Sequence, residues 1–63
     1  MQKITIAAAR KNMNLTQDQM AKRLGVSRKT ICNWEAGRKK MRKANAIAFS
    51  AITGFSEDEL ILP

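Results

Sequence analysis

Two short helical segments separated by little more than one turn are the feature that most constrains this chain. Thr16 followed by Gln19 forms the pattern of a capping box, which predicts the start of a helix. Gly25 predicts the end of that helix, because glycine readily adopts the left-handed conformation that terminates helices. Ser27 then caps a further predicted helix over residues 28–35. Two helices joined this closely, with a glycine in the connection, predict a helix-turn-helix.

Helical periodicity also covers much of the remaining chain. A first helix is predicted from about residue 5 or 6 to Met13, and a fourth over about 44–53, where Gly54 ends it. The expected core-facing apolar positions are Ile6, Ala9, Met13, Met20, Ala21, Leu24, Ile31, Trp34, Ala48, Phe49 and Ile52. These helices would bury their apolar stripes against one another.

The last segment carries a second capping-box pattern, formed by Ser56 and Glu59. It predicts a short fifth helix through about Ile61, so the predicted fold is all-α with five helices. The weak alternation of residues 3–6 leaves an extended segment before the first helix as an open alternative.

The length of 63 residues allows a single domain, 1–63, which buries roughly 60% of its unfolded surface. Its one cysteine, Cys32, cannot form an internal disulfide, and no Cys/His cluster suggests a structural metal. The chain has no histidine, no paired carboxylates outside a helix cap and no phosphate-binding glycine loop. This pattern argues against an enzyme, and we expect no cofactor and no metal.

The charge is strongly unbalanced, with 12 Lys and Arg residues against 5 Asp and Glu and a net charge of +7. This excess favours a polyanionic partner, nucleic acid first and an acidic membrane surface second, while charge that serves only solubility is the alternative. No apolar run approaches the roughly 20 residues of a membrane span. The apolar stretch near the N-terminus is too short for a secretory signal, so we expect a cytoplasmic protein.

The outward side of the predicted third helix is polar, and it carries Arg28, Lys29 and Asn33. The major groove of B-DNA admits one helix of this kind. Arg and Lys are suited to guanine acceptors, and Asn can form two hydrogen bonds with adenine. We therefore expect these three side chains to contact bases. Cys32, on the same side, is interpreted as a small uncharged filler, with a redox switch as the alternative.

The chain resembles the Cro/repressor family of helix-turn-helix regulators from phages and bacteria, often called the Xre type. The resemblance extends from about Ile6 to Leu60. The matching motifs are Leu15-Thr16-Gln17, Met20-Ala21, Leu24-Gly25-Val26-Ser27, Ile31, Asn33-Trp34-Glu35-Ala36-Gly37 and Gly54-Phe55-Ser56-Glu57-Asp58-Glu59-Leu60. It implies a lambda-repressor-like domain that binds double-stranded DNA. The small size of the chain is similar to that of Cro-like regulators from phages and mobile elements. The family commonly has proline where Met41 stands and a large apolar residue near Lys43.

The resemblance also implies roles for individual residues. Thr16 and Gln17, at the start of the second helix, are expected to contact a phosphate, and Ser27 is expected near the backbone or a thymine methyl. Arg10 and Glu35 match a pair that the family often joins in a partly buried ion pair. The expected phosphate-following cations are Arg38, Lys39, Lys40 and Arg42.

The leading hypothesis is a sequence-specific repressor that acts as a homodimer on a partly palindromic operator, because one module offers only one recognition helix. An antitoxin-like or adaptor module with a protein partner, and a cationic membrane-surface protein, are the alternatives. We expect no small-molecule ligand and no membrane partner. Phe55, Ile61 and Leu62 are left as candidates either for a dimer contact or for covering the core near Ile4 and Ile6.

Overall fold

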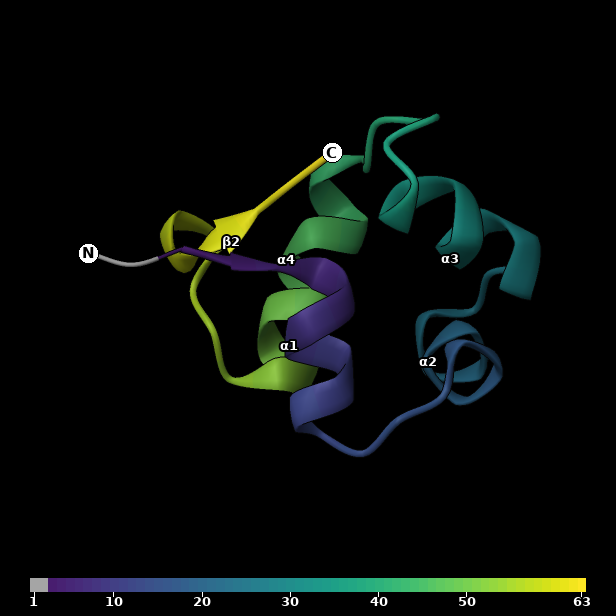
Figure 1. Cartoon of the computed structure of the whole chain (residues 1–63), viewed down its shortest axis with the longest axis horizontal. Helices are drawn as coiled ribbons and strands as arrows, with labels where there is room; N and C mark the ends of the chain where they lie inside the picture. The colour runs from purple at the N-terminus through teal and green to yellow at the C-terminus, as the bar shows by residue number, and fades with distance from the viewer. Residues whose placement is uncertain (1–2) are drawn as a thin grey trace.

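The computed structural model describes residues 3–63. Its elements are β1 (Ile4–Thr5), α1 (Ile6–Asn12), α2 (Gln17–Leu24), α3 (Arg28–Glu35), α4 (Lys43–Thr53), the 3-10 helix η1 (Glu57–Glu59) and β2 (Leu60–Ile61). In Figure 1, α1 and α4 occupy the middle of the molecule, α2 and α3 lie on one side, and the β1–β2 pair lies on the other. The four α-helices therefore lie where the sequence predicts them, within one or two residues at their ends.

Local hydrogen bonds explain where the first two helices begin. The Thr5 hydroxyl accepts a hydrogen bond from the Ala8 N–H at 3.1 Å and so caps α1. Thr16 and Gln19 form the predicted capping box of α2. Each cap satisfies N–H groups that have no partner within the helix itself. The starts of these helices are therefore determined by residues adjacent in sequence.

The core lies between α1, the α2–α3 pair and α4, and Leu60 reaches it from the end of the chain. Its buried apolar residues are Ile6, Ala9, Met20, Ala21, Ile31, Trp34, Ala46, Phe49 and Leu60. Phe55 and Leu62 are half-buried and pack against this core, whereas Ile61 is 50% exposed. Of the three residues that the sequence left as candidates for either a dimer contact or a cover of the core, Phe55 and Leu62 thus pack against the core of their own molecule.

Met13 and Ala48, two of the predicted core positions, differ from the structure. Met13 is 42% exposed, because it follows the last residue of α1 and no longer lies over the core. On α4 the buried residues are Ala46, Phe49 and Thr53, while Ala48 is half-buried and Ile52 is half-buried but still packs against the core. The Thr53 hydroxyl donates to the Phe49 carbonyl at 3.0 Å, which satisfies this polar group inside the protein. The inward face of α4 is therefore rotated relative to the predicted stripe.

The prediction of an all-α fold with five helices holds only in part, because residues 3–63 are mostly helical but form four α-helices and a small strand pair, with a 3-10 helix where the fifth helix was expected. The capping box of Ser56 and Glu59 forms, but it starts only the three-residue η1. The chain is already extended at Leu60, and β2 pairs in parallel with β1, with Ile4 opposite Leu60 and Thr5 opposite Ile61. Pairing with β1 gives the backbone alternative hydrogen-bond partners, and it places Leu60 in the core beside Ile6. The extended segment before the first helix, left open by the sequence, is present as β1.

The longest helix in the described residues is α4, with eleven residues. Among residues 3–63, therefore, no helix has both the length and the apolar character that a bilayer crossing requires.

Candidate nucleic-acid interface

The α2 and α3 helices form a compact pair with a three-residue connection. Gly25 has a φ of 71°, in the left-handed region, and the N–H groups of Gly25 and Val26 both bond to the Ala21 carbonyl. The chain leaves α2 at once and enters the cap of α3 at Ser27, which is extended. Helix α2 packs mainly against α3. This is the predicted helix-turn-helix geometry.

The two sides of α3 differ in the way a groove-binding helix requires. Ile31 and Trp34 are buried on the inner side. On the other side Arg28, Lys29 and Cys32 are exposed, and Asn33 is half-buried. The structure thus brings the three residues predicted to contact bases onto one accessible side of a single helix, with the aromatic residue of this helix in the core.

Ser27 and Thr16 have observed roles as helix caps. The Ser27 hydroxyl accepts from the Thr30 N–H at 3.2 Å and lies 2.9 Å from the Thr30 hydroxyl oxygen. The Thr16 hydroxyl accepts from the Gln19 N–H at 3.1 Å, and the Gln19 side-chain oxygen accepts from the Thr16 N–H at 2.9 Å. Both hydroxyls therefore hold the helix starts, and their contacts with DNA stay predictions.

The segment between α3 and α4 presents a row of cations. Arg38, Lys39, Lys40 and Arg42 are all exposed. Between them Met41, in the position where the family commonly has proline, is half-buried and packs against the core. The Arg38 N–H bonds to the Asn33 carbonyl at 2.8 Å and ties the start of this segment to α3. The cations thus extend from a segment anchored at Met41 and at the end of α3.

Arg10 of α1 and Glu35 of α3 form an ion pair. Arg10 Nε lies 2.7 Å from Glu35 Oε2, and their side chains are only 9% and 13% exposed. Arg10 also donates from Nη2 to Glu35 Oε1 at 3.2 Å and from Nη1 to the Leu15 carbonyl at 2.7 Å. Gln17 Nε2 donates to Glu35 Oε1 at 3.0 Å. This network joins α1, the α1–α2 connection, α2 and α3.

The electrostatics of Glu35 follow from these contacts. Burial alone raises the pKa of its carboxyl. The hydrogen bonds from Arg10 and Gln17, together with the charges of Arg10 and Lys11, outweigh burial, so the pKa lies below its ordinary value. Glu35 is therefore ionised at neutral pH and balances the guanidinium of Arg10.

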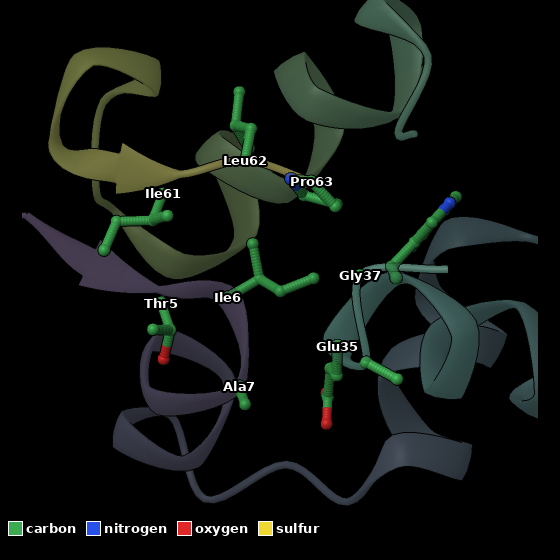
Figure 2. Close-up of a pocket in the computed structure, with 10 residues that line it drawn as sticks. Thr5, Ile6, Ala7, Glu35, Gly37, Ile61, Leu62 and Pro63 are labelled. Atoms are coloured by element: carbon green, nitrogen blue, oxygen red, sulfur yellow. The ribbon is translucent and has the colours of Figure 1, made fainter. Parts of the chain in front are cut away.

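An open cavity of about 320 Å³ lies beside the end of α3. Figure 2 shows Glu35 and Gly37 on one side of it, Ile6 and Ala7 of α1 opposite, and Leu62 and Pro63 above. The lining is mostly apolar and offers one carboxylate, which Arg10 and Gln17 already bind. No group of three or more His, Cys, Asp or Glu residues within 3–63 is placed to hold a metal ion.

Comparison with known proteins decides the family. A family model described as helix-turn-helix matches residues 6–60. The chain belongs to this Cro/C1-type, Xre-like helix-turn-helix family. No match was found among curated proteins or among solved structures. The match covers α1 through the first residue of β2, so the domain is a DNA-binding helix-turn-helix of a regulator.

Within this helix-turn-helix domain, the hydrogen bond between Gln17 and Glu35 was not predicted from the sequence. Gln17 was expected only as a phosphate contact, and Glu35 only as the partner of Arg10. The two residues are 18 positions apart, and no local pattern joins them. The Leu15 carbonyl, which accepts from Arg10, was missed for the same reason, because backbone groups leave no signal in a sequence.

Proposed function

We propose that this helix-turn-helix protein is a sequence-specific repressor that inserts α3 into the major groove of double-stranded DNA. The observation that carries the proposal is the sidedness of α3, with Arg28 and Lys29 exposed and Trp34 buried. A helix that is packed along one side and cationic along the other fits a groove between two phosphate backbones. In this proposal Arg28, Lys29 and Asn33 contact base edges, and Ser27 lies near the backbone or a thymine methyl.

Phosphate contacts would position this helix. We propose that the exposed cations that follow α3 make these phosphate contacts, because a cationic side chain that neutralises a phosphate releases counterions from the DNA. Seven of the twelve Lys and Arg residues fall between residues 28 and 43, where Glu35 is the one acidic residue. Thr16 and Gln17 would add contacts from the start of α2. The proposed phosphate-contacting cations are Arg38, Lys39, Lys40 and Arg42.

We further propose that the protein binds a partly palindromic operator as a homodimer, in the manner of small phage or mobile-element regulators. One module presents one recognition helix, and two-fold pairing doubles the DNA sequence that is read. Ile47 and Ile61, 52% and 50% exposed, provide apolar surface that pairing would cover. We place the protein in the cytoplasm and assign it no catalytic activity and no small-molecule ligand. The stoichiometry of the purified DNA complex in analytical ultracentrifugation tests the dimer, and full-affinity binding as a monomer would refute it.

The main experiment is selection of bound duplexes from a random pool, followed by titration of the selected site with three variants. Arg28→Ala should relax the preference at one base position, at a cost of about 1–3 kcal/mol. Lys39→Ala should weaken all duplexes alike and lower the slope of log K against log salt by about 0.9. Lys3→Ala is the control, because Lys3 is exposed and adjoins β1, on the side of the molecule away from α3 (Figure 1).

Two results would count against the proposal. If no duplex were enriched above a scrambled pool, sequence-specific binding would be excluded. If the protein instead co-purified with a protein partner and did not bind DNA, the antitoxin-like or adaptor interpretation would replace the repressor proposal.

A further inference from the structure

The contact between Gln17 and Glu35 links the start of α2 to the end of α3. Gln17 is the first residue of α2, and Glu35 is the last residue of α3. Gln17 is half-buried and donates from Nε2 to Glu35 Oε1 at 3.0 Å. The other carboxylate oxygen of Glu35 is held by Arg10 at 2.7 Å. Glu35 is therefore fixed from α1 while it holds a side chain of α2.

The chemistry of this contact determines how the amide of Gln17 is turned. A free glutamine amide can rotate so that either its oxygen or its nitrogen faces a partner. An ionised carboxylate only accepts hydrogen bonds, so Glu35 selects the orientation with the nitrogen inward. The nitrogen carries two hydrogens, and Glu35 uses one of them. The second N–H remains as a donor whose direction is set by Glu35.

Arg10 also holds the backbone just before α2. Arg10 donates from Nη1 to the Leu15 carbonyl at 2.7 Å, two residues before Gln17. The capping box of Thr16 and Gln19 then fixes the first turn of α2. The backbone before Gln17 and the side chain of Gln17 are thus constrained by Arg10 and Glu35, neither of which is among the proposed DNA contacts.

We propose that Glu35 is a positioning residue for DNA binding, because it holds the Gln17 amide with its second N–H directed for a phosphate. The proposal rests on the DNA-binding function proposed above. It assigns Glu35 a role in affinity in addition to its pairing with Arg10. A donor that is already oriented loses less entropy when it binds a phosphate, and this favours the complex.

A double-mutant cycle tests the proposal, with Gln17→Met, Glu35→Gln and the double variant titrated against the selected duplex. Gln17→Met keeps the length of the side chain and should weaken binding about tenfold to a hundredfold, the usual range for a hydrogen bond to a charged group. Glu35→Gln should weaken binding about tenfold when Gln17 is present. In the Gln17→Met background it should change affinity less than about twofold, because the group that transmits its effect is gone.

The control separates positioning from lost stability. Ile6→Val removes one buried methylene from α1 without touching the network, and such a change lowers folding stability. This variant should bind DNA as the wild type does. All variants are compared at a temperature where circular dichroism shows them folded. If Glu35→Gln weakened binding equally in both backgrounds, Glu35 would be purely structural and the proposal would be overturned.

A nuclear magnetic resonance measurement on the free wild-type protein tests the orientation without DNA and without any variant. A scalar coupling between Gln17 Nε2 and the Glu35 carboxylate carbon is expected, together with slowed exchange of one of the two amide hydrogens. Freely exchanging hydrogens with no coupling would overturn the proposal, even if Glu35→Gln did not fold. If the wild type bound the duplex and Gln17→Met bound it with the same affinity, the role of Glu35 would be overturned and the proposed DNA-binding function would remain. If the wild type bound no duplex, both would fail, whatever the coupling showed.

Discussion

The two sides of this molecule are built by different means. The α2–α3 pair is defined by neighbours in sequence, since the capping box of Thr16, the left-handed Gly25 and the cap at Ser27 all act within a few residues. The β1–β2 pair joins residues from opposite ends of the chain, with Ile4 opposite Leu60. The first side carries exposed cations, and the second side carries η1 with three of the five acidic residues.

The two sides therefore serve different ends: one carries the proposed DNA-contacting side chains, and the other covers the hydrophobic core. The proposed DNA-contacting side chains extend from a unit whose local geometry is specified by its own sequence. The opposite side closes the core, because Leu60 is 2% exposed and packs with Ile6 and other core residues. The Arg10–Glu35 pair connects α1, which adjoins β1, to α3.

The largest effect is expected at that connection. Glu35→Ala leaves the guanidinium of Arg10 buried without its carboxylate, and breaking a buried pair costs about 3–5 kcal/mol. A chain this short has little stability in reserve. Thermal denaturation followed by circular dichroism measures the loss. An unchanged melting temperature would show that the pair contributes nothing to stability.

A matched pair of substitutions in β2 should reveal how strongly the strand contributes to the core. Leu60→Ala removes a buried side chain and should cost about 2–5 kcal/mol. Ile61→Ala, one residue later, removes a side chain that is half exposed, and its cost should be below about 1 kcal/mol. Urea denaturation gives both values. Equal losses would mean that the two faces of β2 are not distinguished by burial.

A smaller effect is expected at the turn between α2 and α3. A Cβ at Gly25 would meet no atom within 4 Å, so Gly25→Ala introduces only the strain of a positive φ. That strain costs about 1–2 kcal/mol. Gly25→Asn is the control and should lose less, since asparagine tolerates this conformation. If the alanine variant unfolded at the same urea concentration as the wild type, the turn would not depend on the left-handed residue.

The smallest change is expected on acidification. The pKa of Glu35 is lower in the folded protein than its ordinary value, so the folded state binds fewer protons than the unfolded state. The stabilisation from Glu35 is thus complete above its ordinary pKa of 4.5 and is lost as the pH falls through the lower folded pKa. The pKa of Glu59 is also lowered, by hydrogen bonds from Ser56, and this shift acts in the same direction.

Urea midpoints between pH 7 and pH 3 measure this loss, with Glu35→Gln as the comparison. The variant should lose less stability than the wild type over this range. Parallel curves for the two proteins would show that Glu35 does not contribute to the pH dependence.

The sequence by itself determined the four α-helices, the turn at Gly25 and the outward placement of Arg28 and Lys29 on α3. Caps, glycines and helical periodicity act over a few residues, so their physical effect is readable along the chain. It failed at the end of the chain, where the capping box of Ser56 and Glu59 was correct but the helix beyond it was not.

Only the tertiary structure decided that Leu60 continues as a strand, because its partner Ile4 is far away in sequence. The same holds for the hydrogen bond from Gln17 to Glu35 and for the rotation of α4 that buries Thr53. Each of these depends on which surfaces meet once the helices pack. Local sequence fixes where helices start and stop, whereas contacts between distant segments depend on the free energy of the whole assembled core.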